Sequence, residues 1–169
     1  VRGEFNAMRA RAFAGDGYEG VTHAGLAIVV EVEPGIGLVL LAQRAYDETD
    51  DEDVRETWEF PGGGLEPDEE PLSAAFREFA QEVGLTLPQG TVVNGWRAGP
   101  EDNYQGFVYA ADEMIDLTGF VPNEEVQAVA WVPLKAPRDL VLRPEMRDFD
   151  WTLLDAAVSG NEESDMTED

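Results

Sequence analysis

Residues 63–85 of this chain read GGLEPDEEPLSAAFREFAQEVGL, and this stretch predicts a helix between two loops. Pro71 suits the first helical position and Gly84 suits the left-handed residue beyond the last one, so we place the helix over residues 71–83. Apolar side chains recur along it at steps of three and four residues: Leu72, Ala75, Phe76, Phe79 and Val83. Because this spacing forms one apolar stripe, the helix is expected to pack on a core.

A second face of the same helix carries glutamates. Glu78 and Glu82 lie one turn apart, with Gln81 beside them. In a chain this acidic, such a pair is ordinarily a solvated face, although like charges at this spacing destabilise a helix by roughly 0.2–0.5 kcal/mol. Glycines 62–64 precede the helix, and glycine lets a backbone approach a ligand closely. A carbonyl oxygen at that turn plus glutamate oxygens would suit Mg²⁺ or Mn²⁺, so we favour a metal site.

The same residues resemble the Nudix box, whose pattern is G-x5-E-x7-R-E-U-x-E-E-x-G-U, with U a bulky apolar residue. Gly63 matches its first glycine, Glu69 its first glutamate, and Arg77 begins its R-E pair. The remaining matches are Glu78, Phe79, Glu82, Gly84 and Leu85. One position departs from the pattern, because Gln81 stands where the first of the paired glutamates is expected.

The resemblance implies an α/β fold, a Nudix-like α/β/α sandwich with a mixed central sheet, over residues 21–160. It also implies a pyrophosphohydrolase that uses Mg²⁺ or Mn²⁺ to cleave a phosphoanhydride bond in a nucleoside diphosphate derivative. A nucleoside triphosphate or an oxidised nucleotide is our first substrate class. ADP-ribose or a nucleotide sugar is an alternative, because Pro100 resembles a marker of that subgroup. A non-catalytic module that binds a nucleotide or a protein is a second alternative, because Gln81 departs from the box pattern.

Site residues follow from the resemblance position by position. It implies that Glu78 and Glu82 are metal ligands, joined by the Gly62 carbonyl and by the amide oxygen of Gln81. Arg77 would orient the glutamates through its rigid guanidinium.

Two further carboxylates take roles from the family pattern. Glu69 would be structural, at the helix start or paired with an arginine. Family members often add a glutamate from a later loop as a ligand or general base. Glu125, six residues before Trp131, fits that arrangement, with Glu124 as its rival. The predicted catalytic set is therefore Glu78, Glu82, Arg77 and Glu125.

Substrate contacts are expected from residues outside the box. Trp96 and Tyr104 are candidates for stacking on a base, whereas Phe107 fits core packing better. Arg44 either meets substrate phosphates or forms a surface ion pair. His23 is the only histidine, and we interpret it as a strand-end residue rather than a catalytic base.

The rest of the chain predicts strands and one more helix. Residues 25–33 and 37–45 are apolar and β-branched runs joined by Pro34–Gly35–Ile36, which predicts a hairpin. Further strands are expected over 58–60, 91–97, 106–111 and 126–132, and a second helix over 144–158. Residues 46–56 form an acidic loop, for which solvation is favoured over a calcium site. Residues 1–20 are treated as an N-terminal extension and 161–169 as an acidic disordered tail.

Composition narrows the class of partner. The 11 basic and 36 acidic residues give a net charge of −25, which repels nucleic acid and anionic membranes. A phosphate-bearing nucleotide would be repelled too unless bound cations invert the local field. The absence of cysteine excludes disulfides and thiolate metal sites. No apolar run is long enough to span a bilayer and no secretory signal is recognisable, so we expect a cytoplasmic protein and also consider a homodimer.

Overall fold

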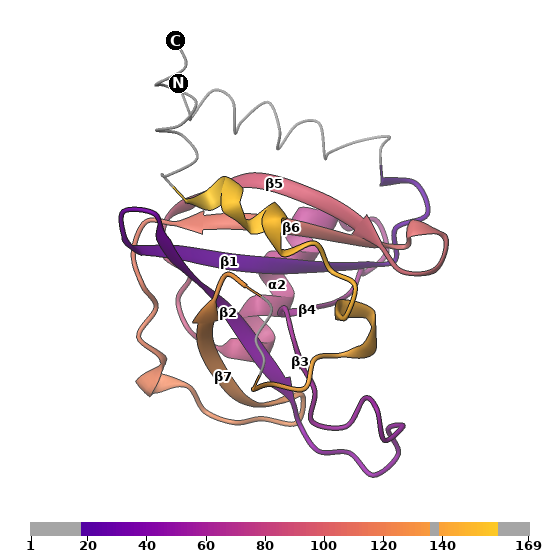
Figure 1. The fold of residues 1–169 in the computed structure, drawn as a ribbon. Helices are drawn as coiled ribbons and strands as arrows, with labels where there is room; N and C mark the ends of the chain where they lie inside the picture. Colours follow the sequence, from indigo (N-terminus) through magenta and orange to yellow (C-terminus); the bar gives the residue numbers. More distant parts are fainter. Residues whose placement is uncertain (1–17, 136–138, 159–169) are drawn as a thin grey trace.

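The computed structural model describes residues 18–135 and 139–158, which form one mixed sheet with helices on both faces (Figure 1). The strands are β1 (His23–Glu33), β2 (Ile36–Arg44), β3 (Trp58–Glu59), β4 (Gly62–Gly64), β5 (Gly90–Ala98), β6 (Tyr104–Ala111) and β7 (Val126–Pro133). The α-helix α2 (Pro71–Val83) follows β4. Short 3-10 segments are η2 (Pro100–Asp102), η3 (Leu117–Gly119), η4 (Pro144–Met146) and η5 (Trp151–Ala157).

The central strand order is β3-β2-β1-β6-β5, with β4 paired to β1 and β7 paired to β2. Strands β1 and β6 run parallel, whereas the other pairs are antiparallel, so the sheet is mixed as predicted. The β1–β2 hairpin is confirmed, and Gly35 adopts the positive φ of 81° that its tight turn requires.

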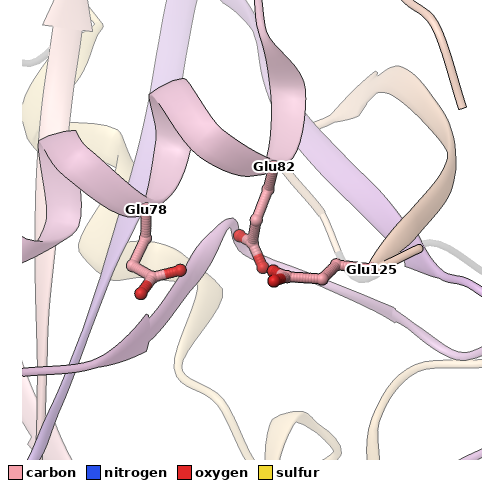
Figure 2. A group of neighbouring side chains, drawn as sticks. All are labelled: Glu78, Glu82 and Glu125. Carbon is pink, nitrogen blue, oxygen red and sulfur yellow. The ribbon is translucent and has the colours of Figure 1, made fainter. Parts of the chain in front are cut away.

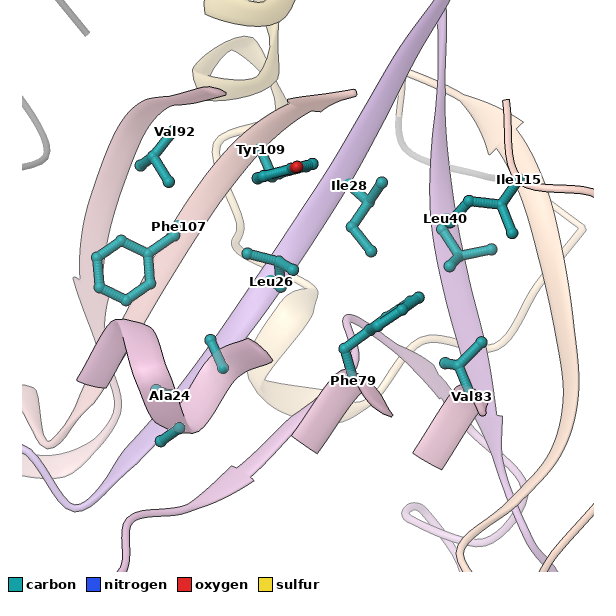
Figure 3. Close-up of a cluster of buried hydrophobic side chains, with 12 residues drawn as sticks. Ala24, Leu26, Ile28, Leu40, Phe79, Val83, Val92, Phe107, Tyr109 and Ile115 are labelled. Carbon is teal, nitrogen blue, oxygen red and sulfur yellow. The ribbon is translucent and has the colours of Figure 1, made fainter. Parts of the chain in front are cut away.

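The hydrophobic core lies on both faces of the sheet. Alternate residues of β1 point to opposite faces, so Leu26 and Ile28 pack against α2 whereas Ala27 and Val29 pack against η4 and η5. Figure 3 shows the first of these layers, in which Phe79 of the helix lies over the sheet. Packing on this face of the sheet therefore fixes the glutamate-bearing helix α2 against β1.

The predicted second helix over residues 144–158 is wrong. The segment forms the separate 3-10 turns η4 and η5, which are held by bonds such as Leu153 N–H to Asp150 O at 3.1 Å. Asp150 interrupts a continuous helix, because its carboxylate accepts from Thr152 N–H at 3.1 Å and starts a new turn. Phe149 instead turns toward Phe60, with ring centroids 5.2 Å apart.

Two predictions at the chain ends fall largely or wholly outside the described residues. These are the N-terminal extension over 1–20, of which the structure describes 18–20, and the acidic tail over 161–169. The proposed domain limits of 21–160 therefore stay predictions. Within the part of the chain that the structure describes, no helix is long and apolar enough to cross a bilayer.

Candidate metal centre

Helix α2 positions two of the predicted ligands. Pro71 occupies its first turn, and Gly84 ends it in the left-handed conformation at φ 69° with its N–H bonded to Ala80 O at 3.1 Å. Phe79 and Val83 are buried in the core, which fixes the rotation of the helix about its axis. Glu78 and Glu82 therefore both face the glycine turn of β4.

Glu82 is the most enclosed carboxylate of the site, with 9% of its surface exposed. Its Oε1 accepts from Gly62 N–H at 2.8 Å. The pKa of Glu82 is raised to about 8, chiefly by burial and also by the nearby charges of Glu59, Glu78 and Glu125, against the lowering effect of the Gly62 bond. A cation beside it would favour the ionised form of this carboxylate at neutral pH.

The third carboxylate comes from the loop before β7. Glu78, Glu82 and Glu125 each offer an oxygen, and these atoms lie within 4.8 Å of one another. In Figure 2 the Glu82 and Glu125 carboxylates point toward each other, and Glu78 lies one helical turn before Glu82. Glu124, the residue before Glu125, is not part of this group.

This donor set fits Mg²⁺ or Mn²⁺. All three side chains supply carboxylate oxygens, which hard divalent cations prefer. The pKa of Glu82 is raised by burial together with the repulsion of its neighbours, and a bound cation would offset that repulsion. Among the described residues, the acidic loop over 46–56 forms no comparable group, and its solvation stays a prediction.

The glycine turn is shaped by these carboxylates. A side-chain carbon on Gly63 would lie 2.6 Å from the Glu78 carboxyl carbon, which is closer than real contacts allow. A side chain at Gly63 would therefore displace the Glu78 carboxylate from its present position. Gly62 contributes its N–H to Glu82, and coordination by its carbonyl oxygen stays a prediction.

Arg77 links the box together, as its predicted role requires. Its Nε and Nη2 donate to the two Glu69 oxygens at 2.8 Å each, and Nη2 also donates to Gly64 O at 2.9 Å. Its Nη1 donates to Glu78 Oε1 at 2.9 Å. The hydrogen bonds from Arg77 lower the pKa of Glu69 to about 2, in line with the structural role expected for it, which stays a prediction.

Gln81 shares that guanidinium. Its amide oxygen accepts from Arg77 Nη1 at 3.1 Å, the same nitrogen that binds Glu78. The side chain is exposed and contacts the ligand set through Arg77. Direct coordination by Gln81 stays a prediction.

We expect Gln81→Glu to tighten Mn²⁺ binding by up to roughly tenfold, because it adds a charge next to the ligands, although Arg77 neutralises part of it. Calorimetric titration of metal-free protein measures this. Gln89→Glu is the matched control. Gln89 directly precedes β5, and that end of the sheet lies beside the last part of β1, whereas the glycine turn pairs with the first part of β1. If Gln81→Glu binds Mn²⁺ no better and turns over more slowly, Gln81 is a substrate contact instead of a missing charge.

The predicted substrate residues have partners within the protein. Arg44 forms a bidentate pair with Asp50 at 2.6 and 3.0 Å, which favours the surface ion pair. The Trp96 ring packs against Phe149, with ring centroids 4.9 Å apart, and its centroid lies 6.2 Å from that of Tyr104. Burial raises the pKa of the Tyr104 hydroxyl. Stacking of a base on either ring therefore stays a prediction.

His23 and Phe107 lie where the sequence predicts. His23 is exposed at the first residue of β1, with Nδ1 2.8 Å from Thr22 Oγ1. Phe107 is 1% exposed in the core. Sequence reasoning missed Glu59, which lies in β3 three positions before Gly62, pairs with Arg143 at 3.0 Å and raises the pKa of Glu82. Its position close to the turn was the available signal.

A sequence model of the NUDIX domain matches residues 21–156. The chain belongs to the Nudix family. The match extends far beyond the box and confirms the resemblance on which the site assignment rests. The triad of Glu78, Glu82 and Glu125 is therefore the candidate metal centre of a Nudix domain.

Curated relatives of this Nudix chain match over part of their length. A protein from Mycobacterium tuberculosis named "Putative 8-oxo-dGTP diphosphatase 3" is 32% identical over 92 residues, covering 52% of this chain and 42% of that protein. An RNA pyrophosphohydrolase from Marinomonas sp. is 35% identical over 66 residues, covering 37% of this chain and 41% of that protein. The aligned part thus spans about two fifths of these relatives.

Solved structures agree on the fold. The MutT protein from Methanosarcina mazei Go1 superposes with a TM-score of 0.53 at 21% identity, covering 80% of this chain and 92% of that chain. A Nudix hydrolase from M. smegmatis gives 0.50 at 22% identity, covering 88% of each chain. These likenesses confirm the Nudix-type α/β fold, and at such identities they concern the fold alone.

Proposed function

We propose that this chain is a divalent-metal-dependent pyrophosphohydrolase that cleaves a phosphoanhydride bond in a nucleoside diphosphate derivative. The observation that carries the proposal is the cluster of Glu78, Glu82 and Glu125, whose oxygens lie within 4.8 Å of one another. A cluster of three carboxylates on a chain of net charge −25 repels polyphosphates unless cations are bound there.

In this proposal the two helix residues of the cluster share one task and the loop residue has another. Glu78 and Glu82 hold the cation from the helix, with Glu82 aimed by Gly62 N–H and Glu78 by Arg77. Glu125 approaches from an exposed loop, so it can serve either as a third ligand or as the base that takes a proton from the attacking water. A bound divalent cation would supply charge neutralisation of the phosphates and a water of lowered pKa.

The substrate class is proposed more narrowly as a nucleoside triphosphate, including oxidised forms. The name of the M. tuberculosis relative supports this choice, whereas the name of the Marinomonas relative supports a triphosphate group on RNA instead. The net charge of −25 repels a long polyanion such as RNA, so we prefer a free nucleotide as the substrate. A non-catalytic module has less support, because such a module has no need of Arg77 and three converging carboxylates.

We expect turnover only with Mg²⁺ or Mn²⁺ and none after chelation, because the cations both attract and activate the substrate. The measurement is chromatographic detection of the nucleoside mono- or diphosphate product across a panel of nucleoside triphosphates, oxidised nucleotides, ADP-ribose and nucleotide sugars. Adding Mn²⁺ back after EDTA should restore the rate. Turnover that survives exhaustive chelation would reject the metal mechanism, and a panel without any turnover would favour the binding module.

A further inference from the structure

One asparagine side chain joins the two chain segments that carry Glu82 and Glu125. Asn123 Nδ2 donates to the backbone carbonyl of Glu82 at 2.8 Å. Asn123 Oδ1 accepts from the backbone N–H groups of Glu125 at 2.9 Å and Val126 at 3.0 Å. A single amide therefore spans from the end of α2 to the loop before β7.

The helix end supplies one half of this contact. The last four carbonyls of a helix have no partner within it, and Glu82 is the residue before the last of α2. The Asn123 amide satisfies this orphan carbonyl in the same residue whose carboxylate lies in the metal cluster. The helix end and the loop are thereby held in contact at Glu82.

The loop supplies the other half. Asn123 N–H donates to Val126 O at 2.9 Å, so the turn around Glu125 closes on the asparagine through both backbone and side chain. Val126 begins β7 and is 3% exposed, whereas Asn123 and Glu125 are exposed. Because Asn123 buries little surface, its contribution lies in these hydrogen bonds rather than in packing.

We propose that Asn123 is a positioning residue that holds the Glu125 carboxylate in place against Glu82 for divalent cation binding. The inference rests on the proposed function, since it concerns the same cluster. Asparagine suits the task because its amide is a donor and an acceptor at once. A serine can keep the turn through its hydroxyl but lacks the reach to the Glu82 carbonyl.

The test is a titration of metal-free protein with Mn²⁺, in which electron paramagnetic resonance measures the concentration of the free ion. Thermal unfolding of each variant is measured alongside. The variants are Asn123→Ser, Glu125→Gln and their combination, with Asn123→Thr as a second substitution should serine impair folding. Asn94→Ser is the matched control. Asn94 makes the same kind of bridge away from the cluster, from its Nδ2 to Leu153 O at 3.2 Å and from Gly95 N–H to its Oδ1 at 2.9 Å.

We expect Asn123→Ser to weaken Mn²⁺ binding by roughly tenfold, the scale at which partners of metal ligands act. In the Glu125→Gln background the same change should have little further effect, because Asn123 acts through Glu125. Asn94→Ser should leave the Mn²⁺ affinity unchanged, whatever it does to the unfolding temperature.

An unchanged Mn²⁺ affinity in Asn123→Ser, or a loss that adds fully to that of Glu125→Gln, would overturn the positioning role while leaving the proposed hydrolase intact. Wild-type protein that binds no Mn²⁺ would overturn the proposed metal site, and the inference with it.

Discussion

Glu82→Gln is expected to lower kcat by at least about a hundredfold, which corresponds to roughly 2.7 kcal/mol of activation free energy. Glutamine keeps the size of the side chain and an oxygen for the 2.8 Å bond from Gly62 N–H, so the backbone turn is preserved. The substitution removes the most enclosed of the three charges that would hold the cation. Steady-state kinetics on the substrate found in the panel, at saturating Mg²⁺, measures the loss.

The control for this substitution is Glu124→Gln. Glu124 is adjacent to Glu125 but outside the three-carboxylate group, so the same change of charge there should leave kcat within about twofold. Circular dichroism of both variants checks the fold. A Glu82→Gln enzyme with the wild-type rate would mean that this carboxylate does not hold a metal needed for turnover.

The metal-free protein should lose stability as the pH rises from about 4.5 to about 8. The pKa of Glu82 is raised from 4.5 to about 8 in the folded state, chiefly by burial. Between these values the folded protein keeps a proton that the unfolded chain has released, so the free energy of unfolding falls with pH. The fall attributable to this carboxyl is on the order of a few kcal/mol, since one pKa unit corresponds to about 1.4 kcal/mol.

Urea unfolding in EDTA at pH 5.5 and pH 8.5 measures this loss in the wild type and in Glu82→Gln. The variant has no proton to lose there, so its stability should be nearly level across this range and should exceed that of the wild type at pH 8.5. The lowered pKa of Glu69 acts in the opposite sense, but only as the pH falls below about 4.5. Equal pH dependence in the two proteins would show that Glu82 is not the buried titrating group.

Adding Mn²⁺ extends the same experiment. A cation that binds the folded state stabilises it by mass action, most strongly where the carboxylates are ionised. The wild type should therefore regain stability at pH 8.5 and little at pH 5.5.

Most of the fold was open to prediction from local patterns. The Pro71–Gly84 boundaries and the spacing of Phe79 and Val83 predict helix α2 because each depends on neighbours within a few residues. Two apolar, β-branched runs joined by Pro34–Gly35–Ile36 likewise predict the β1–β2 hairpin. The helix over 144–158 failed because Asp150 caps a new turn and Phe149 packs on Phe60, so capping and tertiary contacts outweighed periodicity.

The site divides in the same way. Spacing alone puts Glu78 and Glu82 on one helical face. The box pattern left Glu69 either at the helix start or paired with an arginine, and the structure pairs it with Arg77. The approach of Glu125 depends on how the loop before β7 meets the end of α2, a contact between residues 41 positions apart that Asn123 makes through one amide. The packing of Trp96 against Phe149, 53 positions away, was open for the same reason. Local sequence sets which side chains share a helical face, whereas contacts between distant segments depend on strand register and loop closure, which no short pattern encodes.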